Sequence, residues 1–80
     1  MTYYVYILKS LKDQRRYIGM TSKLGFRIRD HVHGLVKSTR KRRPLKLIYC
    51  EEFDSKDEAG KREKFFKSGA GREFLKDIGP

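Results

Sequence analysis

The sequence predicts an α+β fold, a small and mainly antiparallel three-stranded sheet flanked by helices. Two aromatic, β-favouring segments, residues 3–9 and 15–20, are joined by a polar link of hairpin length. A third alternating segment covers residues 45–53, and the remaining segments carry apolar residues at helical spacing. A hairpin, one further strand and helices that pack against a single sheet are typical of this fold class.

The register of the hairpin decides which side chains share a face. If it closes around Leu11 and Lys12, or around Lys12 and Asp13, an odd-numbered residue faces an even-numbered one. Tyr6 and Tyr17 then project from the same face of the sheet. Two neighbouring phenols, followed by a glycine that lets another group approach the backbone, indicate a site more than a core.

The first predicted helix carries a basic pair beside its apolar stripe. Ser22 can cap a helix over residues 23–35, with Gly34 near its end. The stripe is formed by Leu24, Ile28, Val32 and Leu35. On a helical wheel, His31 falls inside this stripe, and Arg27 lies on its flank one turn earlier. A histidine on an apolar face is most often a hydrogen-bonded core residue, and the adjacent arginine is what points to a site.

Two more helices are expected in the C-terminal part. Ser55 followed by Glu58 makes a capping box, so a long helix should start there and run to Ser68, stopping at Gly69. Residues 71–78 should form a short last helix that packs back on the domain.

The long helix turns a carboxylate inward. On its wheel, Glu63 lies on the same side as Ala59 and Phe66, where a charge is costly unless it meets a partner. One explanation is an ion pair with Lys67, one turn later. The other is a hard-cation ligand, because Mg²⁺ is usually held by one or two carboxylates with waters and phosphate oxygens. No physical reason explains Gly60 within this helix.

Composition indicates one domain with a polyanionic partner. The chain has 80 residues, Lys+Arg 20 against Asp+Glu 10 and a net charge of +10. Such an excess of positive charge favours nucleic acid over a membrane surface, because no helix pairs a basic face with a broad apolar one. With no signal peptide or spanning segment expected, we predict a cytoplasmic monomer. Cys50, the one cysteine, is predicted to be a small core residue in a reducing compartment.

The most basic part of the chain follows the first helix. As a structural alternative it is a solvated loop; as a functional element it is a mobile loop that binds phosphates without sequence preference. Its predicted nucleic-acid-binding residues are Lys37, Arg40, Lys41, Arg42, Arg43 and Lys46.

The order of these motifs resembles the GIY-YIG nuclease superfamily, in particular its small stand-alone members. The similarity starts with Tyr4-Val5-Tyr6 and Tyr17-Ile18-Gly19 and covers nearly the whole chain. It continues through Arg27 and His31, the stretch that ends in Tyr49, and the Glu63 region with the glycines that follow.

The resemblance implies a metal-dependent endonuclease acting on DNA, in a repair or structure-directed role. The catalytic residues would be Tyr6, Tyr17, Arg27 and His31, with Glu63 holding one divalent ion, Mg²⁺ or Mn²⁺. Arg27 would clamp a non-bridging phosphate oxygen, and we favour Tyr6 as the phenol that activates or positions the attacking water. His31 would relay a proton or orient its neighbour.

Two features depart from the family pattern. Many catalytic members carry an asparagine late in the fold, whereas this chain contains no Asn, and Tyr4 stands where a glycine is typical. Residues 68–72 would have to substitute for the asparagine, and Tyr4 could crowd the site or stack on a base. Two alternatives therefore stay open: a nucleic-acid-binding module with this fold and little or no catalysis, and a subunit that recruits an acidic protein.

Overall fold

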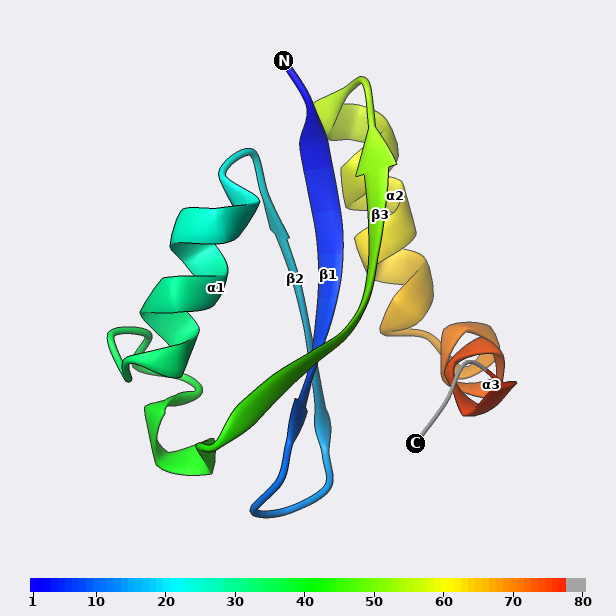
Figure 1. Ribbon diagram of the computed structural model, residues 1–80. Helices are drawn as coiled ribbons and strands as arrows, with labels where there is room; N and C mark the ends of the chain where they lie inside the picture. Colours follow the sequence, from blue (N-terminus) through cyan, green and yellow to red (C-terminus); the bar gives the residue numbers. More distant parts are fainter. Residues whose placement is uncertain (78–80) are drawn as a thin grey trace.

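The computed structural model describes residues 1–77, and it has the predicted α+β architecture (Figure 1). The elements in chain order are β1 (Tyr3–Ser10), β2 (Arg16–Thr21), α1 (Leu24–Val32), the 3-10 turn η1 (Arg40–Arg42), β3 (Leu45–Phe53), α2 (Lys56–Phe66) and α3 (Gly69–Asp77). No helix within residues 1–77 is both long and apolar enough to cross a membrane.

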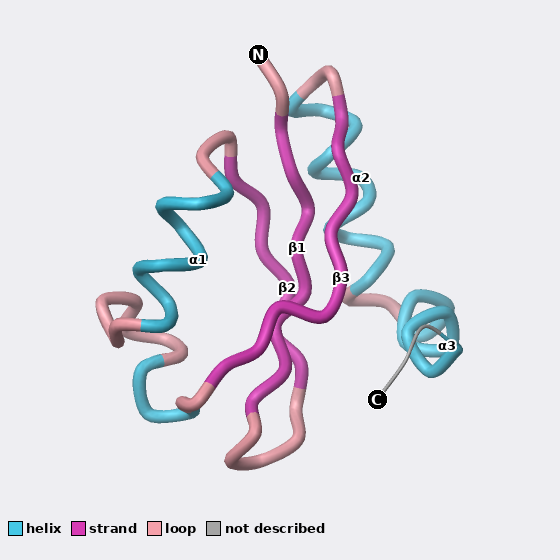
Figure 2. The backbone as a smooth tube through the Cα atoms, viewed as in Figure 1, coloured by secondary structure: helices cyan, strands magenta, loops and turns pink. Residues whose placement is uncertain are grey.

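The described strands form one sheet in the order β2-β1-β3, with β1 antiparallel to both neighbours (Figure 2). Tyr6 pairs with Gly19 and Leu8 with Tyr17, which closes the hairpin between Lys12 and Asp13. This is the second of the two predicted closures. Because side chains alternate along a strand, Tyr6 and Tyr17 lie on the same face of the sheet.

The two faces of the sheet are covered by different helices (Figure 1). The face that carries Val5 and Ile7 packs on α2 and α3, and the fully buried core there includes Ala59, Phe66 and Leu75. The opposite face, which carries Tyr6, turns toward α1. Figure 1 shows α1 on one side of the sheet and α2 and α3 on the other.

The first helix starts and ends differently from the prediction. Its N-cap is Lys23 without a side-chain cap, so Ser22 does not cap it. It ends at Val32 because Gly34 adopts a φ of 77°, a left-handed conformation that favours glycine and reverses the chain direction. Leu35 therefore leaves the predicted stripe and is 72% exposed, while Val36 turns inward.

α2 starts where predicted, whereas its end and the start of α3 each lie two residues before the predicted positions, 68 and 71. The Ser55 hydroxyl accepts a hydrogen bond from the Glu58 N–H at 3.1 Å, which confirms the cap of α2. α2 ends at Phe66, earlier than expected, because the Ser68 hydroxyl accepts from the Gly71 N–H and starts α3 at Gly69. The last residue of the predicted helix, at position 78, lies outside the described residues.

The prediction for Cys50 was wrong. β3 has the predicted bounds, but Cys50 is exposed. It pairs with Tyr6, so it lies on the face of the sheet away from α2 and α3. On an edge strand that face is left to solvent, which strand periodicity alone does not reveal.

Candidate active site

Gly19 creates the space for the first tyrosine. A Cβ atom on residue 19 would overlap Cζ and Oη of Tyr6, so the Tyr6 ring lies directly against the β2 backbone. Glycine permits this close approach because it has no side chain. The ring of a residue on the central strand thereby extends over the edge strand β2, and the group for which the glycine makes room is Tyr6 itself.

Three of the predicted site residues form one aromatic cluster. The ring centroids of Tyr6 and Tyr17 are 6.4 Å apart, those of Tyr6 and His31 5.6 Å, and those of Tyr17 and His31 5.1 Å. The two tyrosines come from the hairpin and the histidine from α1. The structure thus brings together the residues that the register and the helical wheel selected.

His31 is buried and hydrogen-bonded through both ring nitrogens. Its Nε2 lies 2.9 Å from the Tyr6 hydroxyl and its Nδ1 lies 2.8 Å from the Thr39 hydroxyl. Burial lowers the pKa of His31, and the nearby Arg27 charge lowers it further, with a smaller opposing effect of Asp30. The imidazole is therefore neutral at pH 7, and one hydroxyl donates to it while the other accepts from it.

Thr39 is a site residue that the sequence analysis missed. It lies in the basic part of the chain, yet it is fully buried against His31. In the sequence, a threonine among lysines and arginines predicts a solvated loop. Only the folded path of the chain after α1 reveals that it turns inward, and no local pattern in the sequence marks it.

Arg27 lies beside both phenols. Hydrogen bonding to the Tyr6 hydroxyl raises the pKa of Arg27, and Tyr17 adds to this effect. Burial raises the pKa of Tyr6, and the Arg27 guanidinium opposes that shift without overcoming it. A phenol acts as a base at neutral pH only if its pKa is lowered, and the net direction at Tyr6 is the reverse. Its hydroxyl therefore keeps its proton at neutral pH.

Glu63 approaches the tyrosines from α2, which packs on the face of the sheet opposite to α1. It projects from α2, and its side chain and Tyr17 both line one open cleft. Its proximity to Tyr6 contributes to the raised pKa of that phenol. Glu63 also pairs with Lys67, with 3.3 Å between Oε2 and Nζ, which is the structural alternative that the sequence left open.

The donor set around Glu63 suits a hard cation held mainly by substrate and water. Within residues 1–77 no group of three or more His, Cys, Asp or Glu side chains could hold a metal. A lone carboxylate that is 23% exposed and faces a cleft is instead compatible with Mg²⁺, which keeps several waters and binds phosphate oxygens. Such binding would require Lys67 to release Glu63.

The basic segment, residues 37–46, is more ordered than the predicted mobile loop. Arg40–Arg42 form a 3-10 turn, and the Ser10 hydroxyl donates to the Arg42 carbonyl at 2.6 Å. Arg42 also pairs with Asp13 of the hairpin at 3.2 Å. The segment is therefore fastened to the hairpin and, through Thr39, to His31.

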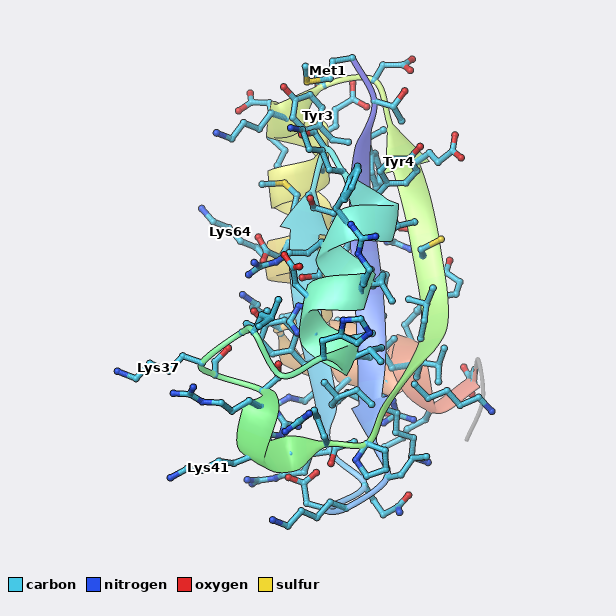
Figure 3. All side chains as sticks on the ribbon, turned by 60° about the vertical axis from the view of Figure 1, so that its left-hand side comes forward. Met1, Tyr3, Tyr4, Lys37, Lys41 and Lys64 are labelled. Atoms are coloured by element: carbon cyan, nitrogen blue, oxygen red, sulfur yellow. The ribbon has the colours of Figure 1, made fainter. Side chains whose placement is uncertain are left out.

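The exposed cations of the basic segment face outward. Figure 3 shows Lys37 and Lys41 extending into solvent, on the same side of the molecule as Lys64 of α2. Arg40, Arg43 and Lys46 are also exposed, whereas Arg42 is partly buried by its pairing with Asp13.

Tyr4, which stands at the family's glycine position, lies apart from the aromatic cluster of Tyr6, Tyr17 and His31. It lines a shallow hollow with residues from the N-terminal half of α1, including Phe26 and Arg29. The described ring contacts of Tyr6 are instead with Tyr17 and His31. Tyr4 is thus accommodated beside α1.

The chain matches a known family. The profile of the GIY-YIG catalytic domain matches residues 2–74, and the chain belongs to the GIY-YIG family. The UPF0213 protein CPE1444 of Clostridium perfringens is 49% identical over 65 residues, 80% of this chain and 69% of the relative. The UPF0213 protein SH2523 of Staphylococcus haemolyticus is 43% identical over 77 residues, 95% of this chain and 93% of the relative.

A solved structure is similar over almost the whole chain. The solution NMR structure of the UPF0213 protein BH0048 from Bacillus halodurans has a TM-score of 0.60 and 38% identity, and the match covers 98% of this chain and 85% of that one. The resemblance to small GIY-YIG members and the α+β fold are both confirmed.

Proposed function

We propose that this protein is a metal-dependent endonuclease that hydrolyses phosphodiester bonds in DNA. The observation that carries the proposal is the convergence of two phenols, a guanidinium and a histidine at one edge of the sheet, with a carboxylate on the adjoining cleft. Family membership supports the reaction class. The net charge of +10 supports a polyanionic substrate.

Arg27 binds the scissile phosphate in this proposal. Its pKa is raised, so it stays protonated throughout the physiological range. A guanidinium beside two hydroxyls can donate to a non-bridging oxygen and stabilise the negative charge that grows there in the transition state. Its interactions with both phenols keep the guanidinium beside Tyr6 and Tyr17.

We assign the attacking water to Tyr17 in place of Tyr6, which the sequence analysis favoured. Tyr6 is 1% exposed and its hydroxyl is engaged by His31, whereas Tyr17 is partly exposed and lines the open cleft. A group that orients water must lie within hydrogen-bond reach of it. Tyr6, His31 and Thr39 then form a buried chain of hydrogen bonds that positions Tyr17 and Arg27.

Glu63 is the residue that would hold the divalent ion, Mg²⁺ or Mn²⁺. When bound there, such an ion supplies neutralisation of the phosphate charge and stabilisation of the leaving oxygen. The basic segment contributes salt-sensitive contacts to the DNA backbone through Lys37, Arg40, Lys41, Arg43 and Lys46.

One observation favours the second candidate, a nucleic-acid-binding module without catalysis. Glu63 is paired with Lys67, which neutralises the carboxylate without any metal. The absence of Asn from the chain agrees with this candidate as well. Both candidates predict DNA binding, so cleavage is what separates them.

The test is cleavage of supercoiled plasmid and of branched and flapped DNA with Mg²⁺ or Mn²⁺. We expect wild-type protein to cut, and Glu63→Gln to bind DNA without cutting it. The matched control is Glu73→Gln, which also removes a carboxylate paired with a lysine on a C-terminal helix and should leave cutting intact. Binding without cleavage by the wild type on every substrate would establish the binding module.

A further inference from the structure

A second basic surface lies between the hairpin end and the helices α2 and α3, whereas the basic segment follows α1. An open cleft of about 670 Å³ separates the end of the β1–β2 hairpin from α2 and α3. We name it the hairpin–α3 cleft. Its cationic lining consists of Arg15, Arg16, Lys67, Arg72 and Lys76. These residues are scattered along the sequence, so no run of charge reveals them; the fold brings them together.

Two of these cations are available for a ligand. Lys67 pairs with Glu63 and Lys76 with Glu73, so their charges are partly compensated. Arg15 and Arg72 are exposed and, within residues 1–77, neither side chain takes part in an ion pair. They approach the cleft from opposite walls, Arg15 from the hairpin and Arg72 from α3. Two uncompensated guanidiniums on one open groove favour an extended polyanion, such as a nucleic-acid backbone, over a single small anion.

The cleft is continuous with the candidate active site. Tyr17 and Glu63, which belong to that site, also line the cleft, together with the apolar side chains of Ile18, Phe66 and Leu75. A strand whose phosphate lies against Tyr17 therefore has the cleft directly beside it. The basic segment follows α1 and joins it through Thr39 and His31, while the cleft is lined by residues of α2 and α3. Figure 1 shows α1 on one side of the sheet and α2 and α3 on the other.

We propose that the hairpin–α3 cleft binds the sugar-phosphate backbone of a nucleic-acid strand on one side of the scissile phosphate, while the basic segment holds the strand on the other side. Arg15 and Arg72 make the phosphate contacts. The path of the strand past Tyr17 rests on the proposed nuclease function. Binding of a strand in the cleft does not depend on that function. A strand held on both sides of Tyr17 continues past the candidate site, as the proposed endonuclease activity requires.

The test is the salt dependence of DNA binding without divalent ions, measured by fluorescence anisotropy on single-stranded and duplex oligonucleotides. Each of Arg15→Gln and Arg72→Gln should reduce the slope of log K against log salt by about one. Arg72→Lys keeps the charge and should retain the wild-type slope. Lys61→Gln removes one exposed charge from α2 outside the cleft and should also leave the slope unchanged. Unchanged slopes in both arginine variants would overturn the proposal.

The result can be separated from the fate of the nuclease proposal. If wild-type protein cuts no DNA but the salt dependence of DNA binding is reduced in both arginine variants, the cleft binds nucleic acid and only the catalytic proposal fails. If the protein cuts DNA and the slopes stay at the wild-type value, the cleft proposal fails and the catalytic one stands. Thermal unfolding of every variant checks that these exposed substitutions leave the fold intact.

Discussion

At the scale of single residues, Gly19 determines whether Tyr6 can occupy its position. Gly19→Ala would place a methyl group within the Tyr6 ring, with the β2 backbone behind it. We expect a loss of about 1–3 kcal/mol in the free energy of unfolding, typical of overpacking, and a large loss of any DNA cleavage. Denaturant unfolding and plasmid cleavage measure the two effects.

Gly25→Ala is the matched control for this change. A Cβ at residue 25 meets no atom within 4 Å, so the same substitution in α1 should not lower the free energy of unfolding and should raise it slightly, as alanine favours helix. Equal stabilities of the two alanine variants would show that the Tyr6 ring moves aside freely. That result would contradict the close packing of the Tyr6 ring against Gly19.

The buried imidazole of His31 predicts a dependence of stability on pH. Burial lowers its pKa below the ordinary 6.5, so the unfolded chain binds a proton that the folded protein excludes. The stabilisation is complete above about pH 6.5 and is lost as the pH falls toward the folded-state pKa, with a slope of at most about 1.4 kcal/mol per pH unit.

Urea unfolding between pH 7.5 and pH 5 measures this slope. His31→Gln should remove this part of the pH dependence, although the variant should also be less stable because the hydroxyls of Tyr6 and Thr39 lose partners. His33→Gln removes an exposed imidazole and controls for the loss of a histidine as such. A wild-type stability that stays constant over this range would contradict the neutral, buried state of His31.

Which individual residues were predictable depends on how far their partners lie along the chain. The shared face of Tyr6 and Tyr17 follows from strand alternation and hairpin parity, and the placement of Arg27 beside His31 follows from helical periodicity. Thr39 needed the path of the chain after α1. Cys50 needed knowledge of which face of β3 remains uncovered, and a periodicity of two says only that faces alternate.

At the scale of elements, boundaries were predictable where a local interaction sets them. The Ser55 cap starts α2, and β3 has the expected bounds, because both depend on residues close in sequence. The end of α1 was misjudged because Leu35 fits the apolar stripe by spacing. The left-handed conformation of Gly34 ends the helix before Leu35. The spacing of apolar residues does not reveal that conformation.

Gly60 gives a prediction for α2 as an element. The sequence offered no reason for a glycine inside this helix, and the structure offers no packing reason, because a Cβ there meets nothing within 4 Å. Gly60→Ala should therefore stabilise the protein by about 0.5–1 kcal/mol, since alanine restricts the unfolded chain and favours helix. Thermal or urea unfolding measures the gain.

Cleavage and DNA binding by Gly60→Ala should match the wild type, since the position lines neither the cleft nor the aromatic cluster. A loss of stability would show that α2 is strained at this point. A loss of DNA binding with stability retained would assign the glycine to an interface.

At the scale of the whole molecule, the candidate site exists because two layers meet at the edge of the sheet. α1 contributes Arg27 and His31 from one face, and α2 contributes Glu63 from the other. Tyr6 extends across Gly19 toward this edge, so both layers reach the same phenols. Periodicity predicts that Glu63 faces inward, but its approach to the tyrosines depends on how α2 crosses the sheet, which no local pattern encodes.

The docking of α2 on the sheet depends on Arg62, a residue that sequence analysis did not single out. Its guanidinium forms two hydrogen bonds with Glu51 of β3, at 2.7 Å and 3.1 Å. It also lies 4.6–5.0 Å from the ring centroids of Phe65, Phe66 and Phe74. One side chain thus links the sheet, α2 and α3. Although burial alone would raise it, the pKa of the Glu51 carboxyl is lowered by its bonds to Arg62 and Tyr49.

Arg62→Gln should therefore loosen α2 and α3 together. We expect a loss of about 1–3 kcal/mol in the free energy of unfolding, less than for a fully buried pair because the two side chains are 29% and 22% exposed. Part of the loss comes from leaving Glu51 unpaired, so the double variant Arg62→Gln with Glu51→Gln should recover some of it. Because α2 carries Glu63, DNA cleavage should fall as well, whereas Lys61→Gln next to Arg62 should change neither property.

Full stability of Arg62→Gln in urea unfolding would mean that apolar packing alone holds α2 on the sheet, and that the ion pair contributes no more than a surface contact.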